Sequence, residues 1–376
     1  MTAPSGRTGD SGRPRYYDAL SGRQLAGPPA GVILQSGESP APEYLVGPAL
    51  FDPQVNGFAG VDFQDPDLDA GALERATAEV RRAGCAHFLL TLITASPAFL
   101  EAQLRRVAEC LAGSQLARET ILGIHLEGPF LSDEDGFAAA HPREHLRAPD
   151  WALFERLQRA AGGQVRLVTL APELPGAIPF IERATAAGVW TAVGHTNASL
   201  DELAAAARAG ARLATHLGNG CPARLPRHDN IIQRILAVPE LTATVIPDGL
   251  HVPPPALANL TRALGPARLA MTTDAMSAAA APSGAYRLGS LELQVGEDRR
   301  VAHPDGDYFA GSSLRMAEGL LNLVRFGGLD ACQAWRAWTS LRRRMFPGLE
   351  APTLLLPFHT GRNRHPAAHL ATDEPI

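Results

Sequence analysis

Eight short apolar segments recur along the chain, and this repetition limits the folds that the chain can adopt. The segments are rich in Val, Ile, Leu and Thr, and Gly, Asn, Asp or Pro interrupts the chain near their ends, a pattern typical of buried parallel strands. They span residues 49–55, 87–93, 121–126, 165–171, 189–194, 211–216, 241–247 and 267–273. Eight such strands predict a (β/α)8 barrel of the TIM type if helices separate them.

Ala- and Leu-rich stretches with helical spacing do lie between these segments, and each is long enough to cross back over a parallel sheet. Four of them span residues 72–82, 151–161, 200–209 and 254–264. A later stretch, Ser312–Phe326, resumes the same spacing and predicts the eighth barrel helix, with Ser312 or Ser313 as its N-cap. The alternation of strands and helices places the chain in the α/β class.

The remaining segments predict a small second region built from the two ends of the chain. Residues 1–15 are rich in Gly, Ser, Pro and Arg and lack apolar periodicity, so we expect a disordered tail. Residues 16–48 and 340–376 contain short possible strands broken by Gly and Pro, which predict an abbreviated β or irregular auxiliary region. The barrel would then occupy residues 49–339, with β hairpins inserted at about residues 283–310.

The basic residues of the chain exclude several types of chemistry. The 376 residues contain no Lys, so all 34 basic residues are Arg. Schiff-base catalysis, a Walker lysine and a carboxylated-lysine metal bridge are therefore impossible. The net charge of −5, with no basic stripe beyond Arg342–Arg344, argues against nucleic-acid binding. We interpret that arginine run as a solvated face outside the functional site.

The cysteines and the hydropathy pattern bear on the compartment. Four cysteines are scattered without a CxxC motif, and the polar N-terminus has no signal-peptide core, so we expect a cytoplasmic protein. No apolar run is long enough for a membrane-spanning helix. Cys221, in HLGNGCP, is an alternative metal ligand, although a lone cysteine more often packs as a small hydrophobe.

Four residues suited to metal-assisted hydrolysis stand singly at the ends of predicted strands. They are Glu127 in IHLEGP, His195 in AVGHTNAS, His216 in ATHLGN and Asp274 in AMTTDAM. A (β/α)8 barrel carries its chemistry at the carboxyl ends of its strands, so these side chains should meet. Each alone is as well explained by a structural hydrogen bond or a turn cap. Their coincidence at four strand ends favours a functional site.

The chemistry of these side chains indicates a reaction type. Glu127, His195 and His216 form a sufficient three-ligand set for zinc, which keeps a further position open for water, and iron, manganese or cobalt suits similar ligands. Such a metal lowers the pKa of its water and polarises a carbonyl, while Asp274 would take the water proton and pass it to a leaving nitrogen. The residues thus predict amide hydrolysis that depends on one divalent metal ion.

Longer motifs follow one another in a recognisable order between about Phe51 and Gly328. They are IHLEGPFLS, LAPEL, VGHTNAS, THLGN, PDGLHV, TTDAMSAA and AGSSLRMAEGLLNLV. In these motifs the chain resembles the N-acetylglucosamine-6-phosphate deacetylase family of the amidohydrolase superfamily. The resemblance implies hydrolysis of the acetamide of an amino sugar phosphate, with the metal on the three ligands above and Asp274 as the acid/base.

The resemblance also implies which residues hold the substrate. His141 would contact it near the acetamide, and Asn219, the Gly220 backbone and His251 would hold the sugar and the phosphate. Arg227 matches the position of an arginine that is offered to the phosphate, sometimes by the neighbouring subunit of a homodimer. The implied partners are a small amino sugar phosphate and a second copy of the chain, with neither nucleic acid nor membrane.

The chain departs from the family pattern at three places. Gln54, Val55 and Asn56 stand where the superfamily often has a His-x-His pair, so we expect one metal ion rather than two. THLGNGCP replaces the usual THLFNAMP, so Gly218 and Gly220 should loosen that loop or enlarge the pocket. The C-terminal end lacks the GxIxxGxxADLV motif. Two alternatives stay open: an amidohydrolase for another N-acyl amino sugar or cyclic amide, and a noncatalytic barrel that binds metal or sugar phosphate.

Overall fold

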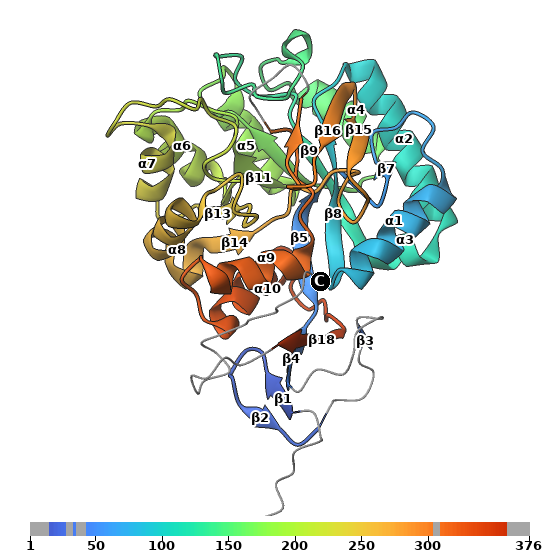
Figure 1. The fold of residues 1–376 in the computed structure, drawn as a ribbon. Coiled ribbons are helices and arrows are strands. Elements are labelled where there is room, and N and C mark those ends of the chain that lie inside the picture. Colours follow the sequence, from blue (N-terminus) through green and yellow to red (C-terminus); the bar gives the residue numbers. More distant parts are fainter. Residues whose placement is uncertain (1–14, 28–32, 35–42, 304–308, 359–376) are drawn as a thin grey trace, which may run out of the picture.

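The computed structural model describes residues 15–27, 33–34, 43–303 and 309–358, and its main part is a parallel barrel (Figure 1). One sheet has the strand order β14-β13-β12-β11-β10-β9-β8-β5. An isolated parallel bridge between Val55 and Ala275 links its two edges, so the sheet closes on itself. The strands are β5 (Leu50–Val55), β8 (Cys85–Ile93), β9 (Ile121–Glu127), β10 (Val165–Leu170), β11 (Trp190–Val193), β12 (Leu213–Ala214), β13 (Thr242–Val245) and β14 (Leu269–Met271). The predicted (β/α)8 barrel is confirmed.

Helices cover the outside of the barrel (Figure 1). They are α1 (Ala70–Arg82), α2 (Pro97–Gly113), α3 (Gln115–Thr120), α4 (Trp151–Ala160), α5 (Ala177–Ala186), α6 (Leu200–Ala209), α7 (Ile231–Ala237), α8 (Pro254–Arg268), α9 (Met316–Arg325) and α10 (Ala331–Met345). Local sequence fixes several starts: the Ser199 side chain and Glu202 form a capping box at α6, and Asp69 caps α1. Among the described residues, no helix combines the length and the apolarity needed to cross a membrane.

The eighth barrel helix begins later than the sequence predicts. Its N-cap is Arg315, with no capping hydrogen bond from the side chain, and α9 starts at Met316. The Ser312 hydroxyl donates to the carbonyl of Thr273 at 2.5 Å, and the Ser313 hydroxyl donates to the carbonyl of Arg299 at 2.7 Å. The prediction that either serine caps the helix was wrong, because both hydroxyls tie the chain before α9 to neighbouring segments.

Helix α10 closes the floor of the barrel and crosses the domain boundary expected at residue 340. Leu341 and Met345 pack in one apolar cluster with side chains from inside the barrel. Those side chains are Phe51, Leu89, Leu167, Ala192, Leu213 and Ala270. At least the segment up to Met345 is therefore continuous with the barrel rather than with the auxiliary region.

Trp335 joins α10 to Pro48, two residues before the first barrel strand, β5. Its side chain is fully buried, and its Nε1 donates a hydrogen bond of 2.9 Å to the carbonyl of Pro48. We expect Trp335→Ala to lower the free energy of unfolding by about 3–5 kcal/mol, because it leaves a large cavity and an unpaired carbonyl. Urea denaturation measures the change. The half-buried Trp151 serves as control, and an equal loss in Trp151→Ala would contradict the assigned role of Trp335.

The arginine run at the end of α10 is only partly the solvated face that the sequence suggests. Arg343 and Arg344 are exposed, but Arg342 is buried and donates to the carbonyl of Leu349. Burial lowers the pKa of the nearby His87, and the positive charges of Arg342 and Arg81 add to this, bringing it to about 4. The barrel floor therefore holds a neutral imidazole beside a buried guanidinium.

This arrangement predicts an acid-dependent loss of stability. The folded pKa of His87 lies below its ordinary value of 6.5, so between pH 6.5 and about 4 the unfolded chain binds more protons than the folded chain. Stability must then fall as the pH falls through this window. We expect His87→Gln to flatten the fall measured by chemical denaturation, whereas His228→Gln, at an exposed position, should keep the wild-type slope. Equal slopes in His87→Gln and wild type would refute this account.

A small separate sheet forms from the two ends of the described chain and lies beneath the barrel in Figure 1. Its strand order is β2-β1-β4-β18-β3. The strands are β1 (Arg15–Asp18), β2 (Gln24–Leu25), β3 (Ile33–Leu34), β4 (Glu43–Pro48) and β18 (Thr353–Phe358). Strand β18 pairs antiparallel with β4, so the predicted small β domain of the chain ends is confirmed. Of the expected tail at residues 1–15, residues 1–14 lie outside the described chain, and Arg15 begins β1.

An antiparallel sheet is inserted between the barrel and α9. It contains β15 (Gly284–Leu288), β16 (Leu291–Val295) and β17 (Val301–Ala302). The backbone N–H of Gly289 donates to Asp62 at 2.8 Å, which ties the insertion to the loop after β5. That loop contains a two-stranded ribbon, β6 (Gly57–Phe58) and β7 (Val61–Asp62).

Candidate active site

The four residues singled out at strand ends lie together at the carboxyl-terminal rim of the barrel. Glu127 is the last residue of β9, His195 and His216 follow β11 and β12 by two residues, and Asp274 follows β14. All four are buried, and all four line one cavity of about 490 Å³. The structure thus brings the predicted set together, and the roles of its members as ligands and acid/base stay predictions.

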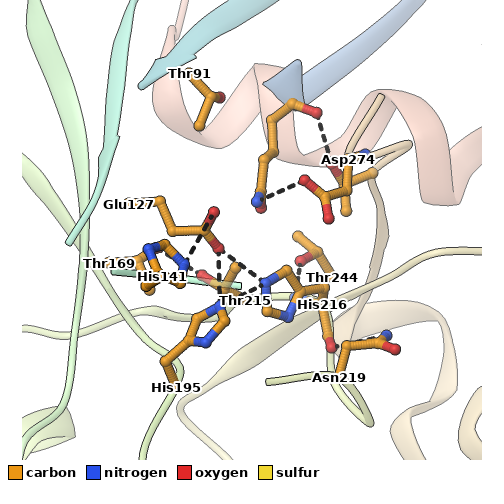
Figure 2. Close-up of polar contacts among 12 residues, drawn as sticks. Thr91, Glu127, His141, Thr169, His195, Thr215, His216, Asn219, Thr244 and Asp274 are labelled. Carbon is orange, nitrogen blue, oxygen red and sulfur yellow. Dashed lines mark hydrogen bonds and ion pairs between the residues drawn. The ribbon is translucent and has the colours of Figure 1, made fainter. Parts of the chain in front are cut away.

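The Glu127 carboxylate and two imidazoles form a compact triangle (Figure 2). Glu127 Oε1 lies 2.8 Å from His216 Nε2 and 3.3 Å from His195 Nε2, and the two Nε2 atoms are 3.2 Å apart. Atoms held about 2.0 Å from a tetrahedral ion are separated by about 3.3 Å. One carboxylate oxygen and two imidazole nitrogens at these separations fit a divalent metal such as zinc.

The orientation of His195 suits a metal ligand. Its Nδ1 donates to the carbonyl of Phe137 at 2.9 Å, so the neutral ring, which is the form that binds a metal, has its lone pair on Nε2, the atom that faces Glu127. His216 Nδ1 is buried and has no hydrogen-bond partner among the described residues. His195 therefore has a fixed tautomer, whereas that of His216 is not fixed by a bond at Nδ1.

His141 is a second neighbour of the same carboxylate. Its Nε2 lies 3.8 Å from Glu127 Oε2, and ligand atoms of Glu127, His141 and His195 fall within 4.8 Å of one another. Two ligand triplets thus share Glu127 and His195. We favour the one with His216, because its Nε2 is nearer and meets the same oxygen, Oε1, as His195 does. His141 Nδ1 lies 2.8 Å from Thr94 Oγ1, so this ring is held beside the triangle.

Three of these residues have a positive backbone φ, which residues other than glycine rarely adopt. The φ angles are 49° at His195, 31° at His216 and 51° at Asp274. Non-glycine residues in this region are strained and persist where the surrounding structure holds them, often at functional sites. The sharp turns after β11, β12 and β14 aim these side chains into the cavity.

The two carboxyl groups differ in their protonation. Burial raises the pKa of Glu127, but hydrogen bonds and positive charge from His195 and His216 outweigh it and hold the pKa well below its usual value. Burial and the charge of Glu127 raise the pKa of Asp274 to about 7. In the metal-free chain, one carboxylate is thus held ionised and the other exchanges a proton near neutral pH, as an acid/base requires.

Comparison with curated proteins identifies the family. The chain is 33% identical over 291 residues to an N-acetylglucosamine-6-phosphate deacetylase of Bacillus subtilis (strain 168). The aligned region covers 77% of this chain and 72% of the relative. This chain belongs to the N-acetylglucosamine-6-phosphate deacetylase family. An N-acetylgalactosamine-6-phosphate deacetylase of Escherichia coli O157:H7 is also 33% identical, over 77% of this chain and 75% of the relative. A scan against protein-family models finds no match.

Solved structures share the architecture. N-acetyl-D-glucosamine-6-phosphate deacetylase of Mycobacterium smegmatis, solved as a D267A mutant with N-acetyl-D-glucosamine-6-phosphate, has a TM-score of 0.77 and 29% identity, and the match covers 91% of this chain and 93% of that chain. The deacetylase of Pasteurella multocida has the same fold, with a TM-score of 0.75 at 23% identity over 88% and 89% of the chains. The structural match to the Mycobacterium smegmatis deacetylase thus covers about nine-tenths of this chain.

Most of the substrate residues that the family resemblance suggests lie at the cavity. His141, Asn219, Gly220 and His251 line it, and His251 Nδ1 is 2.6 Å from Asp248 Oδ2. Arg227 is exposed and is not among the lining residues. Within one described chain, the structure therefore does not bring Arg227 to the site.

The lining also contains residues that the sequence reasoning missed. Arg143 lines the cavity, and its guanidinium donates to Asp135 at 2.6 Å. Two signals pointed to it: it follows His141 by two residues, and a chain without Lys has only Arg for a permanent positive charge. Asn56 also lines the cavity, and the sequence reasoning used it only to exclude a second metal.

The glycines of the altered family loop have different effects. A Cβ on Gly220 would lie 2.8 Å from Nδ1 of His195, so only glycine lets this loop approach the imidazole so closely. A Cβ on Gly218 would meet only Val252, at an ordinary contact distance of 3.8 Å, so here it is the φ of 96°, rather than a close neighbour, that favours glycine. Cys221 also lines the cavity, but its thiol is not part of the metal cluster found among the described residues.

Proposed function

We propose that the chain hydrolyses the acetamide of N-acetylglucosamine 6-phosphate to glucosamine 6-phosphate and acetate. One observation carries this proposal: a carboxylate and two imidazoles at tetrahedral spacing share one cavity with the buried Asp274 at the rim of a deacetylase-family barrel. The family acts on the amide bonds of amino sugar phosphates, and the cavity of about 490 Å³ admits a ligand of that size.

In this proposal, Glu127, His195 and His216 hold one divalent metal ion, and zinc suits the ligand set best. Such an ion, when bound, supplies Lewis-acid polarisation of the acetamide carbonyl and a lowered pKa for water. Asp274 accepts the proton of the attacking water and returns it to the amino nitrogen of the sugar as the C–N bond breaks.

The substrate contacts follow the same proposal. His141 lies beside the metal triangle and would contact the acetamide carbonyl, while Asn219, Gly220 and His251 would hold the sugar and the phosphate. Arg227 would reach the phosphate only from the partner subunit of a homodimer, since it does not line the cavity of its own chain. The homodimer and the cytoplasmic location stay predictions.

A second substrate has a specific observation in its favour. The relative named for N-acetylgalactosamine 6-phosphate is as similar to this chain as the one named for the glucosamine isomer, at 33% identity in both cases. Gly218 lines the cavity without a side chain, which is compatible with an altered sugar position. A noncatalytic barrel is disfavoured, because pure binding does not require the acid/base Asp274.

Acetate release from purified protein tests the proposal. The panel contains N-acetylglucosamine 6-phosphate, N-acetylgalactosamine 6-phosphate and both unphosphorylated sugars, each with and without a chelator followed by zinc. We expect the fastest release from the glucosamine phosphate, loss on chelation and recovery with zinc. Faster release from the galactosamine phosphate would transfer the assignment to that isomer, and no release with metal bound would reject the deacetylase assignment.

A further inference from the structure

Asp274 is held by two amide side chains that belong to the opposite edge of the sheet. Gln54 Nε2 donates to Asp274 Oδ1 at 2.9 Å, and Asn56 Nδ2 donates to the same oxygen at 2.8 Å. Both amides come from the end of β5, and all three residues are buried. The contacts therefore bridge the closure of the barrel, between β5 and the turn after β14.

The two donors make the two oxygens of this carboxylate unequal. A carboxylate oxygen has two lone pairs, and on Oδ1 both are engaged by amide N–H groups. Asp274 Oδ2 accepts no hydrogen bond from the described residues. A proton arriving at this carboxyl group must therefore bind to Oδ2.

A second buried carboxylate fixes the geometry of these contacts. Asp52 Oδ1 accepts from the backbone N–H of Gln54 at 3.1 Å and from the Thr272 hydroxyl at 2.7 Å. Its Oδ2 accepts from the backbone N–H and the hydroxyl of Thr273, at 2.9 and 2.6 Å. One side chain thus sets the distance between the strand that carries Gln54 and the segment that carries Asp274.

We propose that Gln54 and Asn56 are positioning residues that occupy Asp274 Oδ1 and so reserve Oδ2 for proton transfer. This inference rests on the proposed function, in which Asp274 is the acid/base. The neutral amides fix the rotamer of the carboxyl group, which is held at a strained φ of 51°. Both amides are neutral donors, so they leave the net charge of the site to the one proposed metal ion and the carboxylates of Glu127 and Asp274.

The test replaces Gln54 with Met, which keeps the length of the side chain and removes the donor. Gln54 is the better position, because Asn56 lines the cavity and its replacement would also alter ligand contacts. We expect kcat to fall about 10- to 100-fold, as for other residues that orient catalytic groups, with KM and bound metal unchanged.

The chain offers a matched control in Gln103. It is also buried, and its Nε2 also donates two hydrogen bonds, at 2.7 Å to the carbonyl of Phe63 and 2.9 Å to that of Asp65. Gln103→Met should lower the melting temperature and leave kcat unchanged. An equal fall of kcat in the Gln103 variant, or an unchanged kcat in Gln54→Met, would overturn the inference.

A double-mutant cycle tests whether Gln54 acts through Asp274. In an Asp274→Asn background, Gln54→Met should cause almost no further loss of kcat, because the group it positions is gone. A further loss as large as in wild type would reject the inference. The assays use whichever amide of the panel the wild type hydrolyses fastest, so a wrong substrate assignment does not affect them. Should Gln54→Met fail to fold, Asn56→Leu removes the second donor, and its kcat should fall similarly.

Discussion

Replacing Asp274 with Asn is expected to lower kcat by about 10²- to 10⁴-fold, the range for loss of a general acid/base. An amide oxygen can still accept from Gln54 and Asn56, so the side chain should keep its place. The asparagine lacks the second carboxylate oxygen, Oδ2, to which we assign proton transfer. The bound metal should stay at the wild-type amount, because Asp274 lies outside the triangle of Glu127, His195 and His216.

Two measurements on the same Asp274→Asn sample decide this prediction. Metal content by elemental analysis should equal that of the wild type, and acetate release should be nearly abolished at saturating substrate. Activity within a few-fold of wild type would exclude Asp274 as the acid/base. Loss of the metal together with activity would instead make Asp274 a ligand.

Replacing His216 with Ala is expected to remove most of the bound metal and, with it, the activity. Its Nε2 is 2.8 Å from Glu127 Oε1, the shortest contact of the triangle, and two remaining ligands hold a divalent ion weakly. We expect metal per chain to fall well below one at micromolar free zinc. Activity should return only in part when zinc is added in excess.

The same substitution at His141 distinguishes the two ligand triplets. If His216 is the ligand, His141→Ala keeps the metal and mainly raises KM or lowers kcat through lost substrate contacts. If the metal instead lies on Glu127, His141 and His195, the pattern reverses, with metal lost from His141→Ala and retained in His216→Ala.

The barrel and the position of its chemistry were predictable from local sequence. A parallel strand buried on both faces must be apolar throughout, so a single Glu or His at the end of such a strand stands out. The end of β9 shows this in part: four of the six residues before Glu127 are Ile or Leu, although His125 also lies within the strand. Sequence alone did not show that Glu127 Oε1 meets both His195 and His216, because such contacts depend on strand register and on turns with positive φ.

The wrong predictions concern segments whose side chains contact residues far away in the sequence. Ser312 looks like a helix cap, but its hydroxyl bonds the carbonyl of Thr273. The end of α10 looks like a charged surface, yet Arg342 is buried and Leu341 closes the barrel floor. Gln54 and Asn56 were read only as missing metal ligands, since their bonds to Asp274 span more than two hundred residues. Local pattern carries no information about contacts of that range.

The closed floor of the barrel also determines the route by which substrate and products reach and leave the site. Leu341 and Met345 fill the lower end of the barrel in the described structure. Substrate and products must therefore enter and leave at the opposite rim, where His251 and Phe309 line the cavity. In the proposed reaction, acetate would form beside the buried Glu127 and would leave past the sugar if the sugar lies nearer the rim. We therefore expect the sugar to depart first, and added acetate to inhibit competitively with the substrate.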